Sequence, residues 1–272
     1  MYTLTEWLQL DDQIVANIVA QRISTAVIYL NGTRRWFLSQ NKNWADYAKT
    51  TSAAHRQLCQ LFYDHGIQTL IQPILGYDLL ERGYDYLKMA VEQGLAELTR
   101  PDYQNWYQQA EIRVTLYGNW SNTLAEMGFS EVVDLLKLIA ETSIYTKHKL
   151  LLGAFADEGL DNIVALAKNV SRGEELLNRY YGQPVGPVDL IIGSGQPAIW
   201  DLPLLDINKA NLYFLQAPTF CLDKEMLRQI LYDHLYQRIN DDEPYNNPTT
   251  QDWRRAEVLG IGRRTQKGWT AG

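Results

Sequence analysis

The sequence predicts one α/β domain over residues 1–272, with a central, mainly parallel β-sheet flanked by helices. Short runs of β-branched and apolar residues alternate with longer segments in which apolar residues recur every 3.6 positions. This alternation is typical of repeated strand–helix units. A length of 272 residues and a hydrophobic content of 46% are sufficient for one sizeable core.

Local signals place the elements in order along the chain. Asp11 or Asp12 is expected to cap a helix that runs to about residue 22. The first strand follows at 25–30, and a second at 67–75 is expected to break at Pro73. The other expected elements are helices at 43–65, 78–98, 130–146, 162–181 and 222–238, and strands at 111–117, 149–155, 188–192 and 211–215. Residues 241–250 are expected to form a loop, and the tail 254–272 to fold back over the body.

Composition excludes several classes of protein. A formal net charge of -7 argues against a general nucleic-acid surface. Cys59 and Cys221 lack CxxC spacing, and the four histidines lack zinc-ligand spacing. No signal peptide or transmembrane segment is recognisable, so a cytoplasmic protein with free thiols is expected. The 8 Trp, 17 Tyr and 6 Phe serve either as core filler or as lining of a pocket for an apolar or cationic species.

Ligands of an open parallel sheet bind beyond the carboxyl ends of its strands. The segments after residues 30 and 75 are therefore expected to share one rim. This places the loop 31–37 close to the segment 77–82, although the two are far apart in the sequence. The rim is the expected place for chemistry.

The loop Asn31-Gly32-Thr33-Arg34-Arg35-Trp36-Phe37 carries the strongest chemical signal. Gly32 permits close approach of the backbone to a ligand, and the guanidinium groups of Arg34 and Arg35 can each make two charge-assisted hydrogen bonds to phosphate oxygens. These groups suit a diphosphate. The alternative is an ordinary loop with solvated arginines.

Residues 31–36, N-G-T-R-R-W, resemble the D-G-N-x-R-W signature of the cis-prenyltransferases, the undecaprenyl diphosphate synthase family. With Phe37 they are still more similar to the D-G-T-R-R-W-F of its terpene-synthase-like branch, the tuberculosinyl adenosine synthases. Further likeness, which together covers most of the chain, lies at residues 65–67, 78–83, 203–205, 212–214 and 230–234.

The resemblance implies an enzyme that binds a prenyl diphosphate. Gly32, Thr33, Arg34 and Arg35 would hold the diphosphate, and Trp36 and Phe37 would contribute to the prenyl pocket. Tyr47 resembles a family tyrosine near the diphosphate, with a core or surface aromatic as the alternative. Magnesium and a homodimer are further expectations from the family.

The departures from the family concern carboxylates. Asn31 stands where the family has a metal-positioning aspartate, so either a metal is held in another way or activity is weakened or lost. Tyr77 replaces the first aspartate of a D-D-L-L-D stretch, and it could stabilise a carbocation or orient a nucleophile. Asp78 and Glu81 could bind metal, or they could form an acidic first turn that favours the helix dipole.

Other departures disfavour chain elongation by C5 units. Residues 193–199 supply none of the arginines that bind isopentenyl diphosphate in elongating relatives, and Asn211 replaces a glutamate. The sequence thus predicts ionisation of a C15–C20, optionally cyclic, prenyl diphosphate, with catalytic roles for Asn31, Tyr47, Tyr77 and Asp78. Proton loss, water or a nucleophile such as adenosine would quench the cation.

Two other functions compete with this one. A non-catalytic subunit of the same fold, which binds a prenyl diphosphate or a partner, is motivated by the lost carboxylates. A nucleotide-handling enzyme is disfavoured, because no G-x-G-x-x-G follows the first strand and no P-loop lysine is present.

Overall fold

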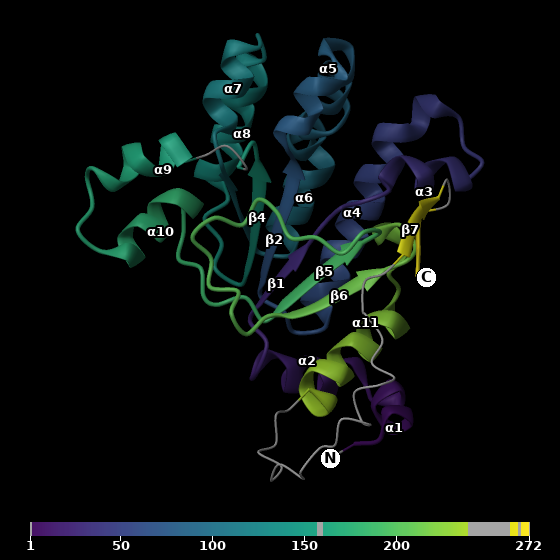
Figure 1. Ribbon diagram of the computed structural model, residues 1–272. Helices are drawn as coiled ribbons and strands as arrows, with labels where there is room; N and C mark the ends of the chain where they lie inside the picture. Colours follow the sequence, from purple (N-terminus) through teal and green to yellow (C-terminus); the bar gives the residue numbers. More distant parts are fainter. Residues whose placement is uncertain (1, 157–159, 239–261, 266–267, 272) are drawn as a thin grey trace, which may run out of the picture.

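Six parallel strands form one sheet in a computed structural model that describes residues 2–156, 160–238, 262–265 and 268–271 (Figure 1). The strand order is β3-β4-β2-β1-β5-β6, and every pairing in this sheet is parallel. The strands are β1 (Thr25–Ile28), β2 (Thr69–Leu75), β3 (Ile112–Tyr117), β4 (His148–Ala154), β5 (Leu190–Ser194) and β6 (Asn211–Leu215). The predicted fold class and all six predicted strands are confirmed.

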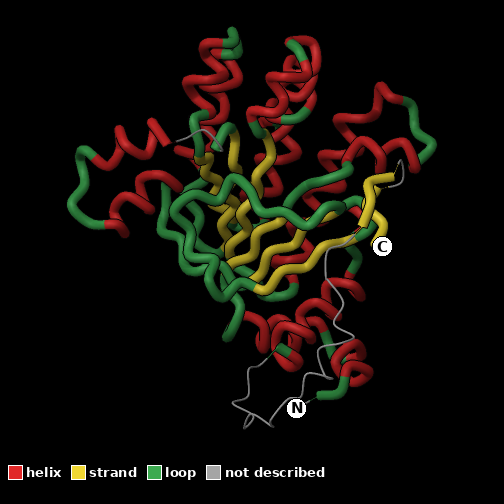
Figure 2. The backbone as a smooth tube through the Cα atoms, viewed as in Figure 1, coloured by secondary structure: helices red, strands yellow, loops and turns green. Residues whose placement is uncertain are grey.

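Helices connect these strands and cover the sheet (Figure 2). The α-helices are α1 (Leu4–Gln9), α2 (Asp12–Ala20), α3 (Thr33–Ser39), α4 (Tyr47–Asp64), α5 (Tyr84–Gln93), α6 (Pro101–Gln109), α7 (Trp120–Glu126), α8 (Ser130–Thr142), α9 (Leu160–Ala167), α10 (Gly173–Tyr181) and α11 (Lys224–Tyr232). Short 3-10 turns are η1 (Trp44–Asp46), η2 (Tyr77–Arg82), η3 (Leu95–Thr99) and η4 (Thr219–Cys221), and a π-helical turn, η5, spans Asp233–Gln237. Among the described helices, none combines the length and apolar character needed to cross a lipid bilayer.

The two faces of the sheet bury different sets of side chains, because successive strand residues point in opposite directions. One face of β1 buries Ala26 and Ile28 against α2, α4 and α11. The other face buries Val27 and Tyr29 against α10 and the long connection from β5 to β6. Three tyrosine hydroxyls donate to backbone carbonyls of this connection: Tyr29 to Trp200 (2.7 Å), Tyr117 to Asp201 (3.1 Å) and Tyr181 to Pro203 (2.6 Å).

The interruptions of three elements differ from the sequence prediction. The single helix predicted at 162–181 is wrong, because α9 ends at Ala167 and α10 begins at Gly173. The single helix predicted at 78–98 is wrong, because Gly83 has φ 90 and separates η2 from α5, and Gly94 separates α5 from η3. A right-handed helix cannot pass through a residue with positive φ. The predicted break of β2 at Pro73 is a shift of register between Pro73 and Leu75, and the strand continues through it. Helices α1, α3, α6 and α7 were not predicted.

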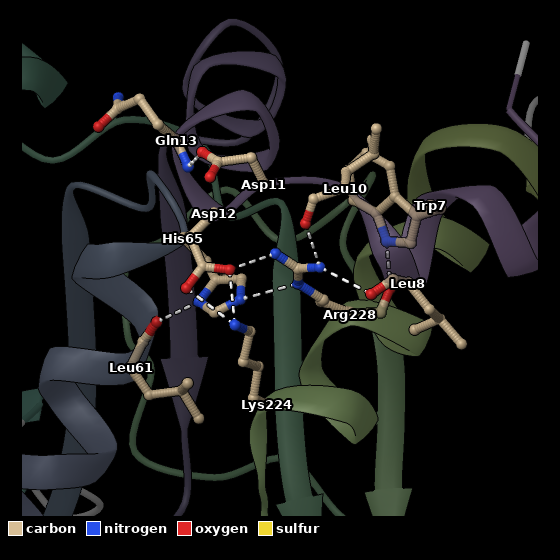
Figure 3. Close-up of polar contacts among 10 residues, drawn as sticks. All are labelled: Trp7, Leu8, Leu10, Asp11, Asp12, Gln13, Leu61, His65, Lys224 and Arg228. Atoms are coloured by element: carbon tan, nitrogen blue, oxygen red, sulfur yellow. Dashed lines mark hydrogen bonds and ion pairs between the residues drawn. The ribbon is translucent and has the colours of Figure 1, made fainter.

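The N-terminal helices are joined to α11 by a buried arginine at the end of the sheet opposite α5 and α7 (Figures 1 and 3). The Arg228 guanidinium donates to the carbonyls of Leu8 (2.9 Å) and Leu10 (2.8 Å) and to the Asp12 carboxylate (2.6 Å). Lys224 pairs with the same carboxylate at 2.6 Å. This network, which we call the Arg228 network, fixes the start of the chain to its last long helix.

The C-terminal region is described in part. Strands β7 (Gly262–Thr265) and β8 (Gly268–Ala271) pair as an antiparallel hairpin. The loop predicted at 241–250 lies outside the described residues, as does the first part of the tail predicted to fold back.

Candidate active site

The turn after β1 is held by segments that are distant in the sequence. The side-chain amide of Asn31 donates to the Ser194 carbonyl (3.2 Å), and its backbone N–H donates to the Thr219 hydroxyl (3.2 Å). Gly32 has φ 78, and a Cβ there would lie 3.0 Å from Cβ of Pro218. The turn therefore needs glycine for its backbone conformation and for close packing.

The predicted loop 31–37 becomes helical at Thr33, so its description as a loop is wrong beyond Gly32. Helix α3 carries Arg34 and Arg35 in its first turn. Arg34 is exposed, and the Arg35 guanidinium reaches back to Gly32, where a side chain's Cβ would lie 3.1 Å from Nη2. Within residues 2–156 and 160–238, neither arginine forms an ion pair with a carboxylate. Both charges remain available to an anion.

A cavity of about 230 Å³ begins beside Arg34 and continues into the protein. Its lining is mainly apolar: Leu30, Ile74, Leu75, Leu79, Met89, Ala90, Leu95, Leu98, Leu152 and Phe220, with Tyr86. Thr33, Arg34 and Tyr47 lie at the end that reaches solvent, where the hydroxyls of Thr33 and Tyr47 are 3.5 Å apart. Three members of the predicted site are thus brought together at one cavity.

The inner end of this cavity is polar, and we call it the inner polar wall: Ser52, His55 and Tyr103, all buried. Nδ1 of His55 is 2.7 Å from the Tyr103 hydroxyl, and Nε2 is 2.7 Å from Oε1 of Gln72. The Gln72 amide donates to Sγ of Cys59 (3.3 Å). Burial lowers the pKa of His55 to about 4 and raises the pKa of Cys59 to about 12. The imidazole is therefore neutral and the thiol protonated at pH 7.

A chain of contacts connects Asp78 to Arg34. Asp78 pairs with Arg82 at 2.7 Å, and the Arg82 guanidinium lies over the ring of Tyr86, 5.2 Å from its centroid. Arg34 lies 5.5 Å from the same centroid. Asp78 thus reaches the cavity indirectly, through residues that support Arg34, while Glu81 is exposed on the same turn.

The other predicted residues lie behind or beside the cavity. Trp36 packs edge-to-face on Phe220, and Phe37 packs edge-to-face on Tyr47. These two aromatics support lining residues and do not themselves line the cavity. The Tyr77 hydroxyl is 3.3 Å from the Asn119 amide nitrogen and 3.4 Å from the Thr123 hydroxyl, on the side of α7.

The donor set does not fit a metal held by the protein. Within the described part of the chain no three His, Cys, Asp or Glu side chains gather closely enough to hold a metal ion. Asn31 already uses its amide nitrogen on Ser194 and offers only a neutral oxygen, and Asp78 is paired with Arg82. Mg²⁺ prefers carboxylate and phosphate oxygens, so we assign it no step.

Sequence reasoning missed the lining residues Ser52, His55, Tyr86 and Tyr103. One signal was available for part of this set. Tyr47, Thr51 and His55 are spaced four residues apart on α4, so they share one helical face, and all three line the cavity. No comparable pattern connects Tyr103 to them.

Comparisons with known proteins identify relatives of the chain. No protein-family profile matches the sequence. Tuberculosinyl adenosine transferase of Mycobacterium tuberculosis is 34% identical over 245 residues, covering 86% of this chain and 82% of the relative. (+)-Kolavelool synthase of Herpetosiphon aurantiacus is 24% identical over 264 residues, covering 90% and 88%.

Two solved structures share the fold. Lavandulyl diphosphate synthase from Lavandula x intermedia, in complex with dimethylallyl diphosphate, has a TM-score of 0.60 and 13% identity, over 78% of this chain and 94% of that one. A probable undecaprenyl diphosphate synthase from Campylobacter jejuni has a TM-score of 0.56 and 16% identity, over 78% and 95%. The two solved structures show the fold, which is that of the cis-prenyltransferases. The relative of 34% identity shows the family: the chain belongs to the tuberculosinyl adenosine transferase family of enzymes.

Proposed function

We propose that the protein is a terpene-synthase-like enzyme that ionises a C15–C20 prenyl diphosphate and releases pyrophosphate. The observation that carries this proposal is the position of Arg34, a guanidinium without a carboxylate partner in the described residues, at the open end of an apolar cavity. A cation beside an apolar cavity suits a ligand with an anionic head and a hydrocarbon chain. The names of the relatives, a tuberculosinyl transferase and a kolavelool synthase, support the same class of substrate.

In this proposal the diphosphate binds between Arg34 and Arg35. Their N–H groups make charge-assisted hydrogen bonds to its oxygens, and the hydroxyls of Thr33 and Tyr47 can donate to the same group. The bond between the prenyl carbon and the diphosphate oxygen breaks, and its electron pair leaves with pyrophosphate. Fixed donors stabilise the charge that develops on this leaving group more than the charge of the bound substrate.

The prenyl cation remains in the cavity, where the mainly apolar walls, which include Phe220, limit the access of water. Loss of a proton, addition of water or addition of a nucleoside such as adenosine ends the reaction. The first two outcomes make the protein a lyase, and the third makes it a transferase. Residues 193–199 supply no arginine for a second diphosphate, so C5 elongation is not part of the proposal.

The test is to incubate the protein with linear and cyclic prenyl diphosphates of C10 to C20, with and without Mg²⁺, and to measure pyrophosphate and organic products. Release of pyrophosphate with formation of an alcohol, hydrocarbon or nucleoside adduct is expected. No release by the protein or by an Asn31→Asp variant would contradict the proposal and favour the non-catalytic binding subunit.

We further propose that the protein is a homodimer, as the family resemblance implies, and that it is located in the cytoplasm. Light scattering coupled to size-exclusion chromatography measures the oligomeric state directly. A mass of one chain, 31.3 kDa, across the working concentration range would contradict the dimer.

A further inference from the structure

Ser52 is buried, and its hydroxyl has no hydrogen-bond partner within the part of the chain that the structure describes. The residue is 8% exposed and lines the cavity of Arg34. The neighbouring Thr51 hydroxyl, in contrast, donates to the Tyr47 carbonyl at 2.8 Å. Although Ser52 is buried, its hydroxyl oxygen is not among the described side-chain atoms that are fully enclosed and unpartnered, so it remains accessible to a polar group in the cavity. Its position on the cavity wall therefore points to a polar ligand inside an otherwise apolar space.

A second polar residue, Tyr103, lines the same cavity. The Tyr103 oxygen is 3.3 Å from the backbone carbonyl of Ser52 and 2.7 Å from Nδ1 of His55. Since the Gln72 amide nitrogen donates to Cys59, Oε1 of Gln72 accepts from Nε2 of His55. The network thus assigns the proton of the neutral imidazole to Nε2, and Nδ1 accepts from the Tyr103 hydroxyl. The phenol oxygen still has a lone pair to accept a hydrogen bond.

These two groups match the requirements of a bound water molecule. A buried water needs at least two polar partners, and a cavity of about 230 Å³ has ample room for one beside a hydrocarbon chain. Ser52 follows Tyr47 by five residues on α4. A water bound at Ser52 would thus lie about 7.5 Å along α4 from Tyr47, beside the prenyl chain and not at the diphosphate.

We propose that Ser52 and Tyr103 position a water molecule that adds to the prenyl cation, and that the Tyr103–His55 pair accepts its proton. This inference rests on the proposed ionisation and specifies how the reaction ends. The product is a prenyl alcohol whose oxygen comes from water.

The step balances without another reactant. A lone pair of the water oxygen forms the bond to the cationic carbon, and one O–H bond of this oxygen breaks. The proton passes to the Tyr103 oxygen while the Tyr103 proton moves to Nδ1 of His55. The resulting imidazolium is buried, and its low pKa, about 4, favours return of the proton to pyrophosphate or solvent. Cys59 stays a thiol throughout, since burial raises its pKa.

The test is a product analysis in ¹⁸O-labelled water, without nucleoside, of the protein and its Ser52→Ala and Tyr103→Phe variants. The ratio of alcohol to hydrocarbon is the decisive quantity, because it does not depend on how much enzyme is folded. Tyr107→Phe is the matched control: its buried hydroxyl donates to the Leu98 carbonyl, and its ring lies 5.7 Å from Tyr103, but it does not line this cavity.

We expect ¹⁸O in the alcohol, a fall of about fivefold or more in the ratio for Ser52→Ala and Tyr103→Phe, and no change for Tyr107→Phe. Unchanged ratios in both variants, or an alcohol without ¹⁸O, would overturn the water site. A fall of the ratio in only one of the two variants would contradict the proposal that Ser52 and Tyr103 position the water together. No pyrophosphate release at all would contradict the proposed function itself, whereas release with unchanged products contradicts only this inference.

Discussion

The guanidinium of Arg34 lies over the ring of Tyr86, 5.5 Å from its centroid. Tyr86 lies on α5 and is itself in contact with Arg82, which pairs with Asp78. Helix α3 after the first strand and the turn η2 after the second are therefore coupled through one aromatic ring. This contact holds the guanidinium group of Arg34 at the open end of the cavity.

Replacing Tyr86 by leucine should weaken binding of a prenyl diphosphate while leaving the cavity wall apolar. Loss of a partly exposed cation–π contact of about 0.5–1 kcal/mol corresponds to about a two- to fivefold rise in Kd. Calorimetric titration with a non-ionisable prenyl diphosphate analogue measures this change. Tyr86→Phe, which retains the ring, serves as the control and should bind like the wild type. Equal affinity of Tyr86→Leu and the wild type would contradict the positioning of Arg34 by Tyr86.

The Arg228 network should make stability depend on pH through Asp12. Its carboxyl is hydrogen-bonded by Lys224, which lowers the pKa of Asp12 below the ordinary value of 3.8. Because this pKa is depressed in the folded state, the ionised carboxylate stabilises the fold above pH 3.8. That stabilisation is lost as the pH falls through the lower pKa of the folded state.

Asp12→Asn should therefore lower the free energy of unfolding at pH 7 by about 1–3 kcal/mol, since the buried Arg228 loses a charged acceptor. The difference from the wild type should shrink as the pH falls below 3.8 and disappear once the pH is below the lowered pKa of the folded state. Urea unfolding at a series of pH values measures both quantities. Asp134→Asn, an exposed change on α8, should have no effect at any pH. A difference between Asp12→Asn and the wild type that persists at the lowest pH would be inconsistent with the role of the carboxylate.

Asn31→Asp should change the response of the protein to Mg²⁺. The Asn31 amide donates to the Ser194 carbonyl, and an ionised aspartate would place two oxygens in repulsive contact there. We expect the variant to have a lower Tm without metal and to recover stability as Mg²⁺ is added, through binding to the folded state. Thermal unfolding with EDTA and with Mg²⁺ compares the two proteins. A rise of Tm with Mg²⁺ in the wild type alone would show that the native donor set holds the ion.

The sheet and its rim were predictable because their signals are local and periodic. Runs of apolar residues in β1, β2, β4 and β5 are buried on both faces, and such runs are distinct from the 3.6-residue period of the helices. Gly83 and Gly94 ended helices where the apolar pattern continued, because backbone conformation at a glycine is independent of that pattern.

The different positions of the two arginines of α3 could not be predicted from the sequence. If residues 31–37 formed a loop, Arg34 and Arg35 would be equally able to bind the diphosphate. In a helix successive side chains point about 100° apart. As a result, Arg34 lines the cavity against Tyr86, and Arg35 folds back to Gly32. The directions of the two side chains depend on how α3 is rotated about its axis, and the turn at Gly32 sets this rotation.

Of the inner polar wall, only His55 had a signal in the sequence, its spacing from Tyr47 and Thr51 on α4, and the wall as a whole could not have been predicted. His55 and Tyr103 are 48 residues apart, and their hydrogen bond depends on how α4 and α6 pack against each other. Neither residue belongs to a motif. Their significance follows only from the hydroxyl of Ser52 and from the cavity that all three residues share.

The central claim is that Arg34 stabilises the charge of the departing pyrophosphate, and steady-state release of pyrophosphate by Arg34→Ala tests it most directly. We expect kcat/KM to fall about 10²- to 10³-fold, as removal of one fixed donor to a developing anion typically causes. Arg179→Ala, which removes an arginine paired with Glu175 on the surface of α10, should retain wild-type turnover. Full retention of turnover by Arg34→Ala would contradict this claim.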